Sequence, residues 1–215
     1  MAGETLTQDW QAFLEDIATS KLYRVGDPIA FQGEPAEHIG YMTSGTAKAI
    51  AYSEDGVDTW LGEFQSGEFF GHTSFLTQKP VNFEITAQTD MTALIIPASA
   101  LPALLDTHRE LNRAFAEDLA KRLDMMMNRL VEALTLSAKG RVCAELMRLS
   151  RPIGIEPDKS IIRPNPVFIE LALRVNSTRE TVSRTVSELQ KKGILTREPG
   201  ALLVQNRGAL KAAIR

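Results

Sequence analysis

The chain has 215 residues, a hydrophobic fraction of 44%, a charged fraction of 24% and a formal net charge of −3, which is ordinary for a globular protein of one large or two small domains. It contains no apolar run near the roughly 20 residues of a membrane span, and its first residues lack the features of a signal peptide, so we expect a cytoplasmic protein without a membrane partner. Its one cysteine, Cys143, excludes an intramolecular disulfide, a four-cysteine zinc site and an iron–sulfur cluster.

The first predicted elements are one helix and then a series of short strands. A helix is expected over residues 7–19, where apolar residues recur at helical spacing after Thr7, which can cap it. Residues 22–97 contain short apolar or alternating runs separated by glycines, which predicts an all-β barrel, sandwich or roll. The helix face is Trp10, Phe13, Leu14 and Ile17; the runs are DPIAF, HIGYM, AKAIAY, DTWLGEF, NFEITA and ALIIP; the glycines are Gly26, Gly33, Gly45, Gly56 and Gly67.

Helical patterns return over residues 98–150 and include a heptad repeat. The repeat predicts a parallel homodimer joined by a coiled coil, and the alternative is a helix buried within its own domain. Leu111, Phe115 and Leu134 widen the apolar face, so this side of the helix is expected to pack on the β domain. Gly140 follows as the expected hinge. The residues of the seam, at 4-3-4-3 spacing, are Leu119, Leu123, Met126, Leu130 and Ala133.

The net charge changes sign along the chain. Residues 1–137 carry 9 basic and 20 acidic side chains, whereas residues 138–215 carry 15 basic and 7 acidic ones. A polyanion is therefore repelled by the first part and attracted to the second. The basic part begins with a helix over residues 140–150, and the proline-rich residues 151–166 form a loop or a hairpin. The predicted inner face of this helix is Val142, Cys143, Leu146 and Leu149.

Residues 165–195 have the pattern of a helix-turn-helix. Asn165 is expected to cap the first helix with Pro166 at its first position, and Asn176 stands where the turn needs a left-handed residue. Thr178 is the expected cap of the second helix. The inward residues are Phe168, Leu171 and Ala172 in the first helix and Val182, Val186 and Leu189 in the second; the outward residues are Arg179, Glu180, Ser183, Arg184 and Ser187.

The outward face of the second helix suits base reading in the major groove of DNA. An arginine such as Arg184 can bridge the O6 and N7 atoms of guanine, and Glu180 can accept a hydrogen bond from the amino group of cytosine. The alternative is an ordinary solvated face, on which Glu180 and Arg184 form an i,i+4 pair. The preceding helix, the turn residue, the basic charge and the dimer seam together favour DNA binding.

The segment ELALRVNSTRETVSR resembles, with the same spacing, the helix-turn-helix of the cAMP receptor protein/FNR (CRP/FNR) family of bacterial transcription regulators. The resemblance covers nearly the whole chain. It implies an α+β protein with a cyclic-nucleotide-binding-like β-roll over residues 1–108, a dimerisation helix over 109–137 and a winged helix-turn-helix over 138–215. It also implies a homodimer that binds double-stranded DNA and RNA polymerase.

The resemblance assigns DNA contacts to particular residues. It implies a TGTGA-like or a TTGAT-like half-site, and Arg179 favours the former. It also implies a wing of two strands that turn at Pro199 and Gly200. The implied base-reading residues are Arg179, Glu180, Ser183 and Arg184, and the implied phosphate contacts, which position the protein without specifying sequence, are Lys139, Thr178, Lys191, Lys192 and Arg197.

The stretch SGEFFGHTSFL (residues 66–76) departs from the family pattern. The family's phosphate-binding cassette carries a glutamate for the ribose and an arginine for the cyclic phosphate. By resemblance, His72 stands at the glutamate position and Val81 or Asn82 at the arginine position, which leaves the cradle without its positive charge. A Thr-Ser pair that meets the adenine becomes Met126 and Met127, so cAMP is not the expected effector. The expected effector pocket comprises Phe70, Gly71, His72, Thr73, Val81, Asn82, Met126 and Met127.

The sequence leaves several functions of the β-roll open. Its cavity is filled by its own side chains and takes no ligand, or it binds an apolar or aromatic small molecule, or His72 ligates haem in a gas sensor. A sensor that acts through protein partners is a further alternative. No motif of an enzyme is present, so no catalytic residue and no cofactor is predicted.

Overall fold

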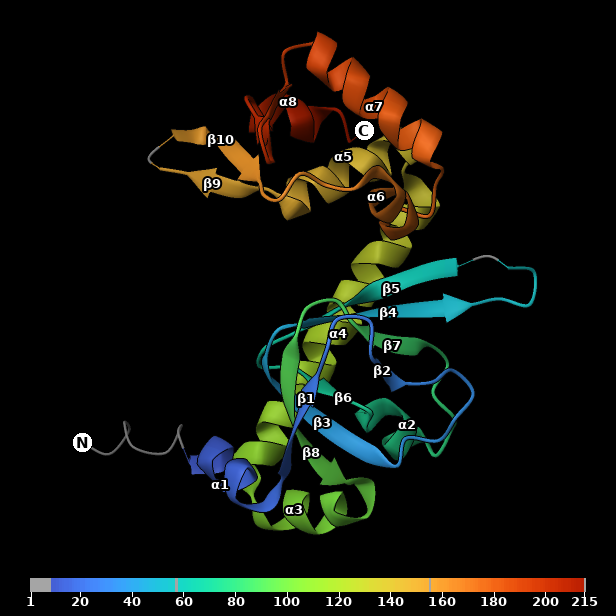
Figure 1. Cartoon of the computed structure of the whole chain (residues 1–215), viewed down its shortest axis with the longest axis vertical. Coiled ribbons are helices and arrows are strands. Elements are labelled where there is room, and N and C mark those ends of the chain that lie inside the picture. Colours follow the sequence, from blue (N-terminus) through green and yellow to red (C-terminus); the bar gives the residue numbers. More distant parts are fainter. Residues whose placement is uncertain (1–8, 57, 155, 215) are drawn as a thin grey trace. The chain divides into compact units, whose positions relative to one another are not determined.

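The computed structural model describes residues 9–56, 58–154 and 156–214 (Figure 1). The chain forms two compact units, Met1–Met125 and Met126–Arg215. The long helix α4 (Arg109–Thr135) contributes residues to both. Within the described ranges, no helix is long and apolar enough to cross a membrane.

The first unit is built around two four-stranded antiparallel sheets, as the prediction of a β-roll requires (Figure 1). One sheet has the strand order β1-β8-β3-β6 and the other the order β2-β7-β4-β5. Side chains of a strand point alternately to its two faces, and in β5 the alternate residues Trp60, Gly62 and Phe64 are buried. The strands are β1 (Thr19–Tyr23), β2 (Pro28–Ala30), β3 (His38–Ser44), β4 (Thr46–Tyr52), β5 (Asp58–Gln65), β6 (Phe69–Phe70), β7 (Glu84–Ala87) and β8 (Met91–Pro97).

Short helices complete this unit. They are α1 (Asp9–Ile17), α2 (His72–Thr77), η1 (Ala98–Ala100) and α3 (Leu101–Thr107). The predicted first helix is confirmed over Asp9–Ile17, but its predicted end is wrong, because Thr19 already belongs to β1; the expected cap, Thr7, lies outside the described residues. Strand β1 and helix α2 were not predicted, because β1 is mostly exposed and α2 is a single short helix inside an apparent loop. The five glycines assigned to turns all have positive φ angles, which favour glycine.

The apolar core of the first unit has two parts. In one, Leu14, Phe69, Leu111 and Phe115 join α1, one sheet and α4, and the rings of Phe69 and Phe115 lie 4.9 Å apart. The other lies inside the roll, and its largest members are Met42, Phe64, Phe70, Ile85 and Met91. Burial of these large side chains is the main favourable contribution to folding.

Helix α4 buries one end of its apolar face and exposes the rest. Leu111 and Phe115 are buried, as predicted. The prediction that Leu134 packs on the β domain is wrong, because its side chain is 78% exposed and belongs to the second unit. Leu123 and Leu130 are 64% and 52% exposed, so none of the described residues covers the heptad stripe at these positions.

The second unit is a winged helix. A four-stranded sheet of order β11-β12-β10-β9 accompanies the helices (Figure 1). The proline-rich segment is a hairpin, one of its two predicted forms, and the predicted wing turns at Pro199 and Gly200. The elements are α5 (Ala138–Leu149), β9 (Arg151–Ile153), β10 (Glu156–Ile162), α6 (Phe168–Arg174), α7 (Arg179–Lys191), β11 (Leu195–Glu198), β12 (Ala201–Val204) and α8 (Arg207–Ala212).

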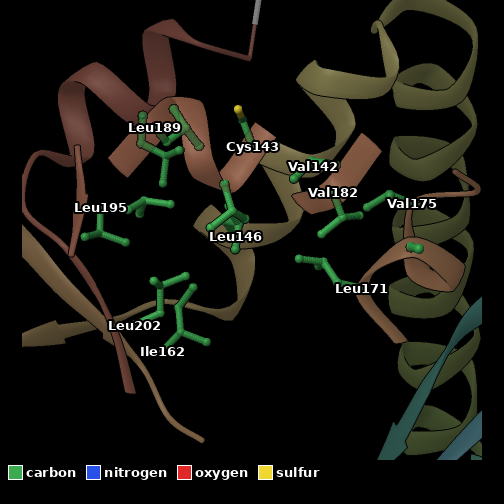
Figure 2. Close-up of a cluster of buried hydrophobic side chains, with 14 residues drawn as sticks. Val142, Cys143, Leu146, Ile162, Leu171, Val175, Val182, Leu189, Leu195 and Leu202 are labelled. Atoms are coloured by element: carbon green, nitrogen blue, oxygen red, sulfur yellow. The ribbon is translucent and has the colours of Figure 1, made fainter. Parts of the chain in front are cut away.

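The core of this unit joins all of its layers, as Figure 2 shows. Leu146 of α5 lies between side chains from α6, α7 and the sheet, including Leu171, Val182 and Leu202. Cys143 is fully buried in the same cluster, as predicted, and burial raises the pKa of its thiol to about 11. A neutral, buried thiol is a packing group rather than a redox sensor.

Two predictions at helix ends of the second unit are wrong. Gly140 is not the hinge: α4 ends at Thr135, Ser137 caps α5, and Gly140 lies inside α5, where an added Cβ atom would lie 2.5 Å from the carbonyl oxygen of Ile214. Close approach of the C-terminal segment therefore explains this glycine. Asn165 does not cap α6, which begins at Phe168; its side-chain amide donates to the carbonyl of Glu198 in the wing.

Candidate DNA interface and effector cavity

The turn between α6 and α7 has the geometry that the sequence predicted. Asn176 has a φ angle of 47°, in the left-handed region that asparagine tolerates. The backbone N–H of Ser177 donates to the carbonyl of Ala172 and closes the turn at 2.9 Å. The hydroxyl of Thr178 accepts from the N–H of Thr181 at 3.2 Å and so caps α7.

Helix α7 separates an apolar face from a polar one. Val182, Val186 and Leu189 are buried against the rest of the unit, as predicted. The four predicted base-reading residues, Arg179, Glu180, Ser183 and Arg184, are all exposed. Within the described residues no ion pair joins Glu180 to Arg184, so both side chains are available to a partner. The geometry suits insertion of α7 into the major groove of DNA.

The predicted phosphate contacts have different surroundings. Lys139 and Lys192 both donate to Oε1 of Glu188, at 2.6 and 2.8 Å, and these hydrogen bonds lower the pKa of Glu188 to about 2. A phosphate group would compete with this carboxylate. Lys191 and Arg197 are exposed. The sequence analysis missed Glu188, although its i,i+4 spacing to Lys192 is a visible signal.

Two further clusters position the helix-turn-helix, and the sequence analysis missed both. Arg141 donates to the carbonyls of Val175 and Asn176 in the turn, at 2.8 and 3.1 Å, and to that of Leu136 just after α4, at 3.1 Å. One side chain thereby ties the end of α4 to the turn before α7. The two contacts with the turn are not local in sequence, so no periodic pattern indicates them.

Glu145 forms the second cluster. Its side chain is 1% exposed and accepts hydrogen bonds from Arg148 and, at 3.4 Å, from Arg174. Nη2 of Arg129, on the last part of α4, lies 3.8 Å from Oε2 of Glu145. The carboxylate therefore links α4, α5 and α6 within the second unit.

A cavity of about 230 Å³ lies inside the first unit. Six of the eight residues predicted for the effector pocket line it: Phe70, Gly71, His72, Thr73, Val81 and Asn82. Gly71 has a φ angle of 82°, and a Cβ atom there would collide with the carbonyl oxygen of His38, so glycine is required. Met126 and Met127 belong to the second unit, and their role in the pocket stays a prediction.

His72 is the buried polar residue of the cavity wall. Its side chain is 2% exposed, and burial, together with the nearby charge of Arg122, lowers its pKa to about 4. The imidazole is therefore neutral at neutral pH. Its Nε2 atom lies 3.7 Å from Oδ2 of Asp118, and burial raises the pKa of that carboxyl group.

The expectation of a cradle without positive charge is wrong, because α4 supplies Arg122 to the cavity wall. Its guanidinium stacks on the ring of Phe64, with 3.7 Å between Cζ and the ring centroid, and donates to Oε2 of Glu68 at 3.1 Å. The buried face of α4 continues from Leu111 and Phe115 at 4-3-4 spacing to Asp118 and Arg122. That continuation is the signal that could have found this arginine.

Comparisons with known proteins agree with both units. Residues 20–108 match the cyclic nucleotide-binding domain and residues 140–213 the Crp-like helix-turn-helix domain. The anaerobic regulatory protein of Bacillus subtilis is 25% identical over 217 residues, which cover 99% of this chain and 90% of that one. The CRP-like cAMP-activated global transcriptional regulator of Mycobacterium tuberculosis is 23% identical over 182 residues, which cover 84% and 81%.

A solved structure has the same fold. The c-di-GMP responsive global regulator CLP of Xanthomonas campestris superposes with a TM-score of 0.78 at 24% identity, covering 91% of this chain and 97% of that one. The family of the chain follows from the two matched domains, from their order and from the geometry of the helix-turn-helix. This chain belongs to the CRP/FNR family of transcription regulators and carries a Crp-like DNA-binding domain.

Proposed function

We propose that the protein is a homodimeric, cytoplasmic regulator that binds a TGTGA-like palindrome and whose effector is not cAMP. The observation that carries the DNA-binding part is the exposed polar face of α7. Its residues can donate to guanine and accept from cytosine without first breaking a pair to each other. The proposed domain organisation is an effector domain over residues 1–108, a dimerisation helix over 109–137 and a DNA-binding domain over 138–215.

The proposed dimer rests on the exposed stripe of α4. Leu123 and Leu130 would pack against the same residues of a second copy in a parallel coiled coil, with Leu119, Met126 and Ala133 completing the seam. A two-fold axis along α4 would present two copies of α7. They would read half-sites roughly 34 Å apart, which is one turn of DNA.

The residues of the cassette argue against cAMP, because His72 and Val81 or Asn82 stand where the family pattern has a glutamate and an arginine. The cavity of about 230 Å³ shares Phe70, Gly71 and Val81 with a second hollow of about 590 Å³, so volume alone does not select the ligand. A haem group would need open space beside His72, which instead packs edge-on against Phe115 at 5.1 Å between ring centroids. Relatives differ in their effectors: the Mycobacterium protein is described as cAMP-activated and the Xanthomonas protein as c-di-GMP responsive.

The proposed mechanism couples the cavity to α4. Arg122 lines the cavity and lies on the helix whose later residues form the seam, so occupancy would shift residues 111–137 against the partner helix. The connection at Ser137 would then move the two α7 helices into or out of the spacing of DNA grooves. The ligand must bind the two states with different affinity. RNA polymerase is the proposed partner at the promoter.

A salt titration of DNA affinity tests this function. A regulator that neutralises phosphates loses affinity steeply as salt increases, with a linear log–log dependence. The measurement uses the full chain on a TGTGA-N6-TCACA duplex and on random DNA of equal length. A steep slope on both, with tighter binding to the palindrome, is expected. Equal affinity for both duplexes would contradict sequence reading, and no binding to either would favour a sensor that acts through protein partners.

A charged residue in the stripe tests the dimer. Leu130→Glu should give monomers in sedimentation velocity and weaken DNA binding, since two like charges would face each other across the seam. Lys121→Glu, an equally exposed change on α4 outside the seam, is the control and should remain dimeric. A Leu130→Glu protein that stays dimeric would contradict the seam.

A further inference from the structure

The wall of the β-roll cavity combines an apolar body with positive charge. Phe64, Phe70 and Phe83 contribute rings, and Val81 and Ile85 contribute aliphatic surface. The charged residues among the described lining residues are Lys79 and Arg122, and no carboxylate belongs to that lining. An apolar ligand with a negative charge is complementary to such a wall.

Polar atoms of residues in this wall lack hydrogen bonds. Nδ1 of His72 and Nε of Arg122 are buried without a hydrogen bond to any described residue, and Nε2 of His72 faces Oδ2 of Asp118 at 3.7 Å, with neither of these two atoms hydrogen-bonded. Buried polar groups in native proteins are nearly always hydrogen-bonded, so such atoms in one cavity indicate that something else satisfies them. The neutral imidazole can donate one hydrogen bond and accept one, while the guanidinium can only donate.

The arginine is held in place for this role. Its Nη2 donates to Glu68 and its Cζ lies 3.7 Å from the centroid of the Phe64 ring, so the direction of its Nε–H is fixed. Glu68 compensates the charge of Arg122, which leaves Lys79 as the positive charge without an ion pair among the described residues. One surplus positive charge matches a monoanion better than a phosphate dianion.

From the cavity lining and the unpartnered atoms of His72 and Arg122, we propose that the effector is a compact carboxylic acid with an aromatic or branched apolar body. Its carboxylate is compensated by Lys79 and receives hydrogen bonds from the cavity donors, and its body packs against Phe64, Phe70 and Phe83. This inference rests on the proposed function, in which the cavity is the effector site. A cyclic nucleotide, with its larger polar body, does not suit the same wall.

Calorimetric titration of the full chain with matched probes tests the inference. The acids are benzoate, phenylacetate, 1-naphthoate and 3-methylbutanoate, and each has its neutral amide as the control ligand. We expect at least one acid to bind saturably and at least tenfold more tightly than its amide. Absence of saturable binding by all four acids at millimolar concentration, or equal affinity of acid and amide, would overturn the proposal, as would tighter binding of cAMP.

A variant pair separates charge recognition from general effects. Lys79→Gln should weaken binding of the acid about five- to tenfold and leave the amide unchanged. Lys48→Gln on β4, away from the cavity lining, should change neither. Equal effects of the two variants would overturn the role of Lys79. DNA binding is measured on the same samples. If the full chain binds DNA specifically but binds none of the acids, only the proposed effector class is rejected. If the full chain does not bind DNA specifically, the proposed function is rejected.

Discussion

The polar face of α7 and the polar cluster around the β-roll cavity are built in opposite ways. On α7, Arg179, Glu180 and Arg184 are exposed, and no ion pair among them constrains their side chains. Around the cavity, His72, Asp118 and Arg122 are largely buried and lie within reach of one another or of Glu68. Exposed groups keep their hydration until a partner arrives, whereas buried groups have already lost it during folding.

This difference separates binding from stability. A change on α7 should alter affinity for DNA and leave the fold intact. A change in a buried charge cluster should alter the free energy of unfolding as well, because it leaves other charges without compensation. The four predictions below test this separation.

The largest effect is expected at Glu145, the buried carboxylate of the second unit. Glu145→Ala should lower the free energy of unfolding by about 3–5 kcal/mol, since Arg148, Arg174 and Arg129 lose their shared partner. Urea unfolding followed by circular dichroism measures the loss. Glu117→Ala, which removes an exposed pair with Arg113, is the control and should cost far less. Equal losses would contradict the burial argument.

The second prediction concerns the pH dependence that His72 adds. Its pKa is about 4 in the folded chain and 6.5 in an unfolded one, so the unfolded state binds more protons between these values. The contribution of His72 to the free energy of unfolding is therefore fully present above pH 6.5. It decreases as the pH drops toward 4, by at most about 3 kcal/mol. Asp118 and Arg122 face the imidazole with opposite charges, and burial of the imidazole is the main reason that its pKa is lowered.

Comparison of His72→Gln with the parent protein isolates this contribution. Unfolding is measured in urea from pH 7 to pH 4, and the difference between the two proteins is followed, since other carboxylates contribute equally to both. The parent should lose more stability on acidification than the variant. Parallel curves would mean that His72 is protonated as easily in the folded chain as in the unfolded one.

Two arginines of α4 offer a matched comparison. Arg122→Ala should cost about 2 kcal/mol of stability, because it removes a partly buried pair with Glu68 and the packing of the guanidinium on Phe64. Arg113→Ala removes an exposed pair and should cost clearly less stability, because both side chains stay hydrated. Differential scanning calorimetry at neutral pH compares the two variants. If Arg122→Ala lost less stability than Arg113→Ala, the assignment of Arg122 to the wall of the cavity would be wrong.

The smallest effect on stability is expected on α7. Arg184→Ala should weaken binding to the palindrome by about 1–3 kcal/mol, weaken binding to random DNA less, and change stability by no more than about 0.5 kcal/mol. Lys191→Ala, a predicted phosphate contact, should weaken both duplexes alike. If Arg184→Ala weakened both duplexes equally, Arg184 would contact phosphate and not a base.

The helix-turn-helix could be predicted from the sequence because its determinants are local. The spacing of Val182, Val186 and Leu189, the cap at Thr178 and the left-handed turn at Asn176 all lie within 14 residues, and the structure confirms each one. The start of α6 was placed wrongly, since Asn165 donates to the wing, a contact that no local pattern indicates.

The cavity could be predicted only in part. Local resemblance located Phe70, Gly71 and His72, but Arg122 lies 50 residues beyond His72 and reaches the cavity through packing of α4. Likewise, Arg141 donates to the carbonyls of Val175 and Asn176, more than 30 residues away in the sequence. Such tertiary contacts depend on how elements pack, which periodicity and spacing do not specify.

Fluorescence anisotropy of a labelled TGTGA-N6-TCACA duplex, with random DNA as competitor and with and without cAMP, tests the central claim most directly. The account predicts specific binding by the full chain whose affinity does not change when cAMP is added. Specific binding that arises only with cAMP would contradict the interpretation of the cavity. Binding that random DNA abolishes at equal concentration would contradict base reading by α7.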